Sequence, residues 1–265
     1  MTIRFASFLG DNGFEFYRRV VACVGKAAGL ATEMVADTSP GLDAMFAQGM
    51  IDGAFGCGLP YVWKAAEPTP SVRLLAAPVL PAARYADRPI YFADVIVRRD
   101  SRFHSLQDLR GVAFAYNQSA SFSGYVLPCY HWLTQGEILH QFFGKMVETG
   151  SHANSMDWVE GGRADCAAID SVVLEMEMLQ RPARADIFRV VTTAGPASMP
   201  PVIASARLDP ETHARLREAL TQMHTTERGQ AVLTQGGVSR FAVVKDTDYD
   251  DIRRIYRAVE VGVLI

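Results

Sequence analysis

Apolar residues along the first part of the chain alternate between strand-like runs and helical spacing. Residues 3–8 form a short apolar run typical of a buried strand. Residues 14–28 then carry apolar side chains at helical intervals, and Gly29 follows as a helix-ending residue. Further strands and helices are predicted in turn at residues 32–36, 40–46, 53–56, 60–66 and 72–79. Repeated strand–helix units predict an α/β lobe with a mainly parallel sheet flanked by helices.

A second series of the same kind begins at Tyr91. Its predicted strands and helices lie at residues 92–97, 112–116, 123–134, 146–149, 151–160, 166–169 and 188–192. Residues 193–201 contain one glycine and three prolines and are predicted to connect two lobes. Helices are then predicted from Asp209 and over residues 247–261. We therefore expect lobe 1 to comprise residues 1–90 and 202–265, and lobe 2, inserted between them, residues 91–201.

The amino-acid composition and net charge of the chain limit the kinds of molecule that it is expected to bind. The chain has 265 residues, a net charge of −3 and 49% hydrophobic residues, which is typical of a globular protein with no nucleic-acid partner. No apolar run is long enough for a membrane span, so an integral membrane protein is not expected. No export leader precedes residues 3–8, so the chain as written is expected in the cytoplasm or is a processed form. The four cysteines form no CxxC pair and the histidines show no metal-ligand spacing, so neither a metal nor a cofactor is predicted.

The most informative junction between a strand and a helix spans residues 117–125. Ser119, Ser121 and Ser123 stand before and at the start of the predicted helix. Hydroxyl donors, unpaired backbone amides and the positive end of the helix dipole together suit an oxyanion such as phosphonate, phosphate or carboxylate. The alternative is that Ser121 or Ser123 only caps the helix.

Two further junctions place polar groups at the same edge of the predicted sheet. Thr149, Gly150 and Ser151 are followed by His152, the one histidine placed at such a junction. Asp170 stands at the carboxyl end of the next predicted strand, where it either faces the ligand or caps the following helix. No nucleotide-binding glycine pattern or nucleophile elbow is present, so no catalytic residue is assigned.

Five blocks of the sequence are similar to those of a known protein family. They are residues 91–101, 105–111 (SLQDLRG), 121–125 (SFSGY), 149–152 (TGSH) and 165–171 (DCAAIDS). In order and spacing these blocks resemble the phosphonate-binding family of ABC-transporter solute receptors. The resemblance implies a type II periplasmic-binding-protein fold of two α/β lobes, joined by two hinge crossings and closing on a small anion. It also implies a periplasmic location and an ABC permease as partner.

The resemblance assigns roles to individual residues. It implies that Ser121, Ser123 and Gly124 hold the oxyanion with hydroxyls and amides, that His152 adds a donor, and that Tyr91 lines the cleft. Phe122 stands where the family has a threonine, which removes one hydroxyl and leaves oxyanion binding better supported than phosphonate binding in particular. The remaining expected ligand-binding residues are Tyr61, Ser119, Phe122, Tyr125, Ser151 and Asp170.

Two other functions are compatible with the same fold. One is a cytoplasmic enzyme of the kind that acts in menaquinone or thiamin biosynthesis, for which Asp170 or His152 is the available base. The other is a ligand sensor that has no permease. The leading hypothesis is a solute receptor, without enzymatic activity, that closes on a small oxyanion.

Overall fold

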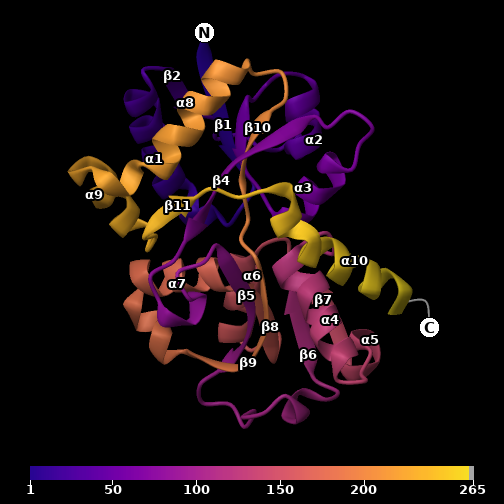
Figure 1. Cartoon of the computed structure of the whole chain (residues 1–265). Coiled ribbons are helices and arrows are strands. Elements are labelled where there is room, and N and C mark those ends of the chain that lie inside the picture. Colours follow the sequence, from indigo (N-terminus) through magenta and orange to yellow (C-terminus); the bar gives the residue numbers. More distant parts are fainter. Residues whose placement is uncertain (263–265) are drawn as a thin grey trace. The chain divides into compact units, whose positions relative to one another are not determined.

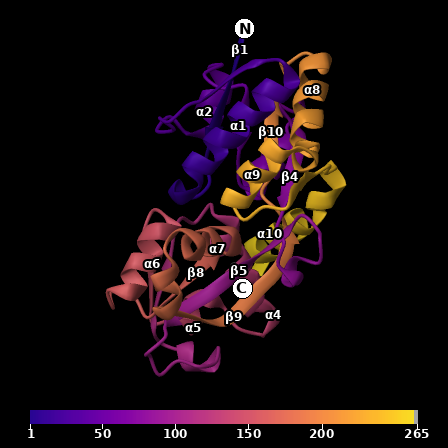
Figure 2. The ribbon, with the colours of Figure 1, turned by 90° about the vertical axis from the view of Figure 1, so that its left-hand side faces the viewer.

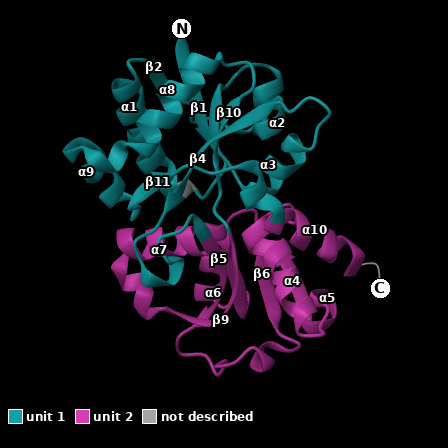
Figure 3. Cartoon of the chain, viewed as in Figure 1, with its two compact units in different colours: residues 1–90, 198–250 teal, residues 91–197, 251–265 magenta. Residues whose placement is uncertain are grey.

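A computed structural model describes residues 1–262, apart from the side chain of Asp11. The chain forms two compact units, residues 1–90 with 198–250 (unit 1) and residues 91–197 with 251–265 (unit 2), as Figure 3 shows. The chain therefore passes from one unit to the other after residues 90, 197 and 250. Two crossings were expected from the sequence, with the whole of residues 202–265 in the first lobe, so the assignment of the terminal helix differs.

Unit 1 is built on a six-stranded mixed sheet in the order β11-β4-β10-β3-β1-β2. Figure 1 labels β1, β2, β4, β10 and β11 of this sheet. Its strands are β1 (Thr2–Ser7), β2 (Ala31–Met34), β3 (Gly53–Phe55), β4 (Val72–Val79), β10 (Val202–Ser205) and β11 (Arg240–Ala242). β1 pairs in parallel with β2 and β3, whereas β10 is antiparallel to β3 and β4, and β11 is antiparallel to β4. The strands contributed by the second half of the chain thus make the sheet mixed rather than mainly parallel.

The helices of unit 1 are α1 (Phe14–Ala28), α2 (Gly41–Ala47), α3 (Gly58–Ala65), α8 (Pro210–Thr221) and α9 (Glu227–Gln235). α1 buries one apolar face, which includes Val20, Val21 and Val24. The helix approaches β2 so closely that a Cβ atom on Gly25 would lie 2.1 Å from the Thr32 Oγ1 atom. The apolar period read from the sequence therefore corresponds to the buried face of α1.

Unit 2 contains a five-stranded sheet in the order β7-β6-β8-β5-β9. Its strands are β5 (Ile90–Arg98), β6 (Ala113–Tyr116), β7 (Lys145–Glu148), β8 (Cys166–Asp170) and β9 (Phe188–Ser198). β6 is parallel to both β7 and β8, so the carboxyl ends of these three strands share one edge of the sheet. β5 runs antiparallel to β8, which brings the start of β5 to the same edge.

Helices cover both faces of the unit 2 sheet. They are the π-helical turn η4 (Phe122–Val126), α4 (Leu127–Thr134), α5 (Leu139–Phe142), α6 (His152–Glu160), α7 (Ser171–Gln180) and α10 (Asp250–Gly262). One core contains Met156 and Val159 of α6 with Leu174 of α7, packed on Ala115 and Ile169 of the strands. In Figure 2, α6 and α7 lie on one side of the strands of this unit and α4 on the other.

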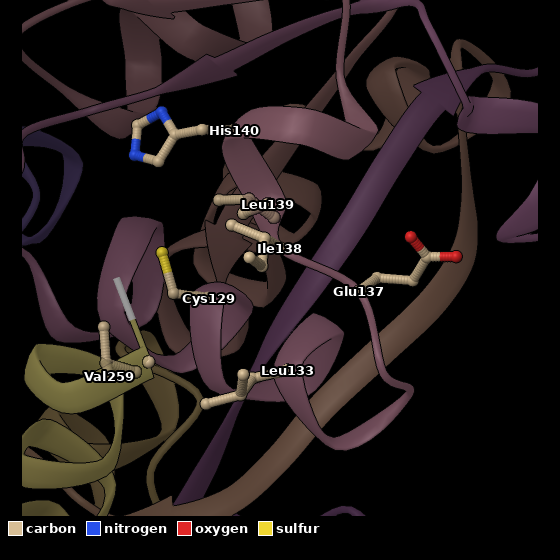
Figure 4. Close-up of a pocket in the computed structure, with 8 residues that line it drawn as sticks. Cys129, Leu133, Glu137, Ile138, Leu139, His140 and Val259 are labelled. Carbon is tan, nitrogen blue, oxygen red and sulfur yellow. The ribbon is translucent and has the colours of Figure 1, made fainter. Parts of the chain in front are cut away.

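The terminal helix α10 packs on α4, which explains its place in unit 2. The Arg254 guanidinium donates a hydrogen bond to the Tyr130 hydroxyl at 2.8 Å and lies over the Tyr130 ring. Gly262 contacts Leu133, and Val259 lines a small, largely apolar pocket with Cys129 (Figure 4). These contacts join residues more than a hundred positions apart, which the order of elements along the chain does not indicate.

Two other segments differ from the sequence prediction. The helix expected over residues 123–134 begins with a π-helical turn at Phe122 before it continues as α4. Part of the connection expected at residues 193–201 is β-structure, because β9 extends to Ser198. Across residues 1–262, none of the helices is both long and apolar enough to cross a bilayer.

Candidate oxyanion site

Three helix starts gather at the shared edge of β6, β7 and β8. Each start is capped by a side chain that follows its strand. Ser121 Oγ accepts from the Gly124 amide at 3.1 Å, Ser151 Oγ from the Asn154 amide at 3.1 Å, and Asp170 Oδ1 from the Val172 amide at 2.8 Å. Ser121 and Asp170 therefore cap the helices that follow them, as the alternative interpretation of each residue predicted. Each helix start also leaves first-turn backbone amides without intrahelical partners, and these amides can bind an anion.

Ser123 is the central side chain of the site. Its hydroxyl donates to Asp170 Oδ2 at 3.3 Å and lies 3.4 Å from His152 Nε2. The exposed fractions of the three residues are 3% for Ser123, 7% for His152 and 7% for Asp170. The parallel order of the strands thus brings together a hydroxyl, an imidazole and a carboxyl group that are 29 and 47 positions apart in sequence.

Burial perturbs both titratable groups. The pKa of Asp170 is raised to about 7, chiefly because burial penalises its charged form. The amides of Val172 and Val173 and the Ser123 hydroxyl counteract this rise, while the charge of Asp94 adds to it. The pKa of His152 is lowered to about 4 by burial, and the Ala168 backbone offsets a part of that. At neutral pH the imidazole is therefore uncharged, and Asp170 is close to half-protonated.

Close packing holds the loop before η4 against the loop before α6. A Cβ atom on Gly124 would lie 1.8 Å from Asn117 Oδ1 and 3.2 Å from His152 Cε1, so glycine is required there. The Asn117 carbonyl accepts from the Gly150 amide at 2.8 Å, and Gln118 Nε2 donates to the Gly150 carbonyl at 3.2 Å. These contacts position Ser123 beside His152.

Other residues singled out from the sequence lie elsewhere or are packed in the interior. Tyr91 and Phe122 each have 0% exposure, so in this conformation neither ring is an accessible wall. The Tyr125 hydroxyl is 2.5 Å from His140 Nε2, and the Tyr125 ring packs on Tyr116. Ser119 is exposed.

Tyr61 belongs to unit 1. Its hydroxyl donates to Asp246 Oδ1 at 2.7 Å, and its ring packs edge-on against Tyr249 with 4.8 Å between centroids. Within unit 1 this buried tyrosine therefore serves packing and holds α3 to the segment before α10. Its expected role in ligand binding stays a prediction.

Asp94 was not singled out from the sequence. This carboxylate has 1% exposure on β5, beside β8, and Thr193 Oγ1 donates to its Oδ1 at 2.7 Å. Its signal in the sequence is one acidic residue inside the apolar run of residues 91–97. A carboxyl group in a fully buried strand requires a polar partner, which Thr193 provides.

The arrangement is suited to binding rather than to nucleophilic catalysis. In a hydrolase triad the histidine stands between the serine and the carboxylate and receives the serine proton. Here Asp170 bonds the serine directly, and the low pKa of His152 makes the imidazole a weak base. Within residues 1–262, no group of three or more His, Cys, Asp or Glu side chains is placed to hold a metal ion.

Two α/β units, one of which gathers three helix starts at one edge of its sheet, are typical of a solute-binding protein of the type II periplasmic fold. A family model described as "ABC transporter, phosphonate, periplasmic substrate-binding protein" matches residues 10–249. The chain therefore belongs to this family, whose members are transporter binding proteins and not enzymes. The expected family, fold and receptor class are confirmed.

Solved structures show the same fold at low sequence identity. A binding-protein component of an ABC phosphonate transporter from Pseudomonas aeruginosa is 18% identical with a TM-score of 0.83, and the match covers 98% of this chain and 88% of that one. PhnD1 from Prochlorococcus marinus, in complex with methylphosphonate, is 17% identical with a TM-score of 0.81 and 98% coverage of both chains. A Xanthomonas citri protein bound to ATP is 20% identical, with a TM-score of 0.68 and coverage of 98% and 97%. No curated protein matches the chain.

Proposed function

We propose that this protein binds a small tetrahedral phosphorus oxyanion, such as a phosphonate, phosphite or phosphate, at the edge where η4, α6 and α7 begin. The observation that carries the proposal is the Ser123 hydroxyl, buried and hydrogen-bonded between His152 and Asp170 among three helix starts. Unpaired first-turn amides supply donors for the anion oxygens, and the helix dipoles favour negative charge. The methylphosphonate complex of the Prochlorococcus protein supports the choice of ligand class.

The protein's partner follows from its family. We propose that the loaded receptor delivers its anion to an ABC permease and acts in the periplasm, as the family description states for its members. A tagged full-length protein in its native host is expected in the periplasmic fraction and to co-purify with a permease. Recovery in the cytoplasmic fraction alone would contradict this part of the proposal.

Isothermal titration calorimetry tests the ligand. Methylphosphonate, phosphite, inorganic phosphate and acetate are titrated separately into the purified protein. We expect at least one phosphorus oxyanion to bind with a Kd of about 1 μM, equivalent to about −8 kcal/mol. If every one of these anions binds more weakly than about 1 mM, about −4 kcal/mol, the proposed function is wrong.

A pair of serine variants locates the site. Ser123→Ala removes a hydroxyl that we expect to turn its hydrogen from Asp170 to the bound anion, and a hydrogen bond to a charged group contributes about 1.5–3 kcal/mol. We therefore expect the Kd to rise about tenfold or more. Ser155→Ala is the matched control, because Ser155 is also fully buried in unit 2 but bonds Thr149 Oγ1 at 2.6 Å. Equal effects of the two substitutions would place the anion elsewhere.

A further inference from the structure

The helix that starts at Ser121 contains a proline beyond its first turn. The helical segment runs without a break from η4 into α4, because Val126 and Leu127 at the join both have right-handed helical dihedral angles. Pro128 follows directly, and its side chain is buried. In an uninterrupted α-helix the ring of Pro128 would clash with the carbonyl group of Gly124, and Pro128 would lack the amide hydrogen to bond to that carbonyl group.

The π-helical turn η4 removes this conflict. The Ser121 carbonyl accepts from the Val126 amide at 3.1 Å, whereas in an α-helix it would accept from the Tyr125 amide. Because the turn is wider, α4 begins afresh at Leu127, and Pro128 stands in the first turn of α4. An amide hydrogen is not needed in the first turn of an α-helix, so the proline is tolerated there.

We propose that Pro128 is a positioning residue that holds η4 in the π form and thereby frees the backbone amide of Tyr125 to bind the anion. Hydrogen bonds in a π-helix reach one residue further along the chain than those in an α-helix. A π-helical start therefore leaves one more amide without an intrahelical partner. This inference rests on the proposed function, because it adds a donor to the same site.

The additional amide matters because other amides at this helix start are already used. The Ser121 amide donates to a carbonyl group of the preceding loop at 3.0 Å, and the Gly124 amide donates to the Ser121 hydroxyl at 3.1 Å. The amides left for an anion are those of Phe122, Ser123 and, in the π form alone, Tyr125. Amides in the first turn of a helix point along the helix axis beyond its start, so these donors are aimed in one direction.

Local preferences of the chain oppose this arrangement. A residue that precedes proline disfavours helical dihedral angles, yet Leu127 has a φ of −66° and a ψ of −41°. π-Helical turns are rare, and they occur frequently at functional sites. An unfavourable local conformation at the start of the helix that bears Ser123 therefore points to a role in binding.

Hydrogen exchange of backbone amides in the unmodified protein tests the proposal first. The full chain is labelled with ¹⁵N-tyrosine, which reports the Tyr125 amide. Tyr130 lies in α4 and provides the internal comparison, because its amide bonds within an α-helical turn. In the free protein we expect the Tyr125 amide to exchange at least about a hundredfold faster than the Tyr130 amide. Saturating methylphosphonate should slow the exchange of the Tyr125 amide and shift its resonance.

Two variants then separate the effect of the proline from that of packing. Pro128→Ala removes the ring and restores an amide, so η4 should return to the α form and the Tyr125 amide should be protected without ligand. The Kd for methylphosphonate should rise about tenfold or more, because one hydrogen bond to a charged group is lost. Leu127→Ala is the matched control, because it removes more side-chain volume from the neighbouring buried position but keeps the proline. It should lower stability and leave the Kd and the exchange of the Tyr125 amide nearly unchanged.

The two proposals fail in different ways. If the Tyr125 amide is already protected in the free protein, or if methylphosphonate binds without affecting it, the inference is overturned and the receptor function stands. The same conclusion follows if Pro128→Ala binds methylphosphonate as tightly as the unmodified protein, or no more weakly than Leu127→Ala. If no phosphorus oxyanion binds the unmodified protein, the proposed function itself is wrong. Exchange measurements on the unmodified protein decide the question even if Pro128→Ala does not fold.

Discussion

Replacing Asp170 with asparagine is expected to stabilise the protein in alkaline solution while altering its site. The pKa of Asp170 rises from 3.8 to about 7 on folding, chiefly because its carboxyl group is buried. The folded state therefore holds this proton more tightly than the unfolded chain does. The stability that the proton contributes is fully present below pH 3.8 and is lost as the pH rises through 7.

The change in the free energy of unfolding can be calculated from the pKa shift of Asp170. A rise of about three pKa units corresponds to about 4 kcal/mol at about 1.4 kcal/mol per unit. Asp170 loses this stabilisation between pH 3.8 and about pH 7, and about two of those pH units lie between pH 5 and pH 8. Over that range Asp170 therefore lowers the free energy of unfolding by about 2–3 kcal/mol. The amide side chain that Asp170→Asn introduces has no charge to bury, and its oxygen can still accept from the Val172 amide that Asp170 now caps.

The assay compares urea unfolding of the unmodified protein and of Asp170→Asn at pH 5, 6, 7 and 8. The difference between the two curves removes contributions common to both proteins, including that of His152. The pKa of His152 is lowered to about 4, so its contribution is present above pH 6.5 and lost as the pH falls through 4. The variant should gain about 2–3 kcal/mol relative to the unmodified protein between pH 5 and pH 8. Parallel curves would refute a buried, uncompensated carboxyl group at this position.

Three further substitutions test local parts of the structure. Gly124→Ala places a Cβ atom 1.8 Å from Asn117 Oδ1, so it should cost about 1–3 kcal/mol in urea unfolding and abolish methylphosphonate binding in calorimetry. Thr226→Ala removes the side-chain cap of α9, which accepts from the Gly229 amide at 3.1 Å, and should lower stability by about 1 kcal/mol without affecting binding. Ala86→Gly should raise the melting temperature, because Ala86 has a φ of 51° and a glycine adopts that conformation without strain, a gain of about 1 kcal/mol.

Each of these substitutions has a matched control. Gly56→Ala introduces a Cβ atom with nothing within 4 Å and should leave both stability and binding nearly unchanged. Thr226→Ser keeps the capping hydroxyl and should retain most of the stability. Ala83→Gly alters the same turn as Ala86→Gly, where φ is not positive, and should destabilise. Equal results for a substitution and its control would show that the named contact or backbone conformation is not the cause.

The helices and strands that frame the site follow from local features. The apolar run at residues 166–169 and the polar Asp170 after it predict a buried strand followed by a capped helix, and both are present. Ser151 stands between a predicted strand and a predicted helix, which indicates a helix cap, and its side chain caps α6. Such features depend on neighbours within about one helical turn, so a single sequence contains the information.

Other parts of the site depend on packing between distant segments. The contact of the Tyr125 hydroxyl with His140, fifteen positions away, is one example that the sequence did not indicate. Asp94 was not singled out from the sequence, and its influence on Asp170 arises because β5 pairs with β8. The terminal helix was assigned from the sequence to the first lobe, whereas Arg254 bonds Tyr130 in the second unit.

The sequence by itself determined that polar groups follow three strands at residues 116–123, 148–152 and 170–171, and that helices start there. It also contained the blocks by which the family is recognised. Only the tertiary structure decided that one hydroxyl, Ser123, lies between an imidazole and a carboxyl group, and that burial shifts the pKa of both. The physical reason is that strand order and side-chain burial arise from contacts between residues tens of positions apart. The spacing of apolar residues along the chain indicates which face of a helix or strand is buried, but not which other segment packs against that face.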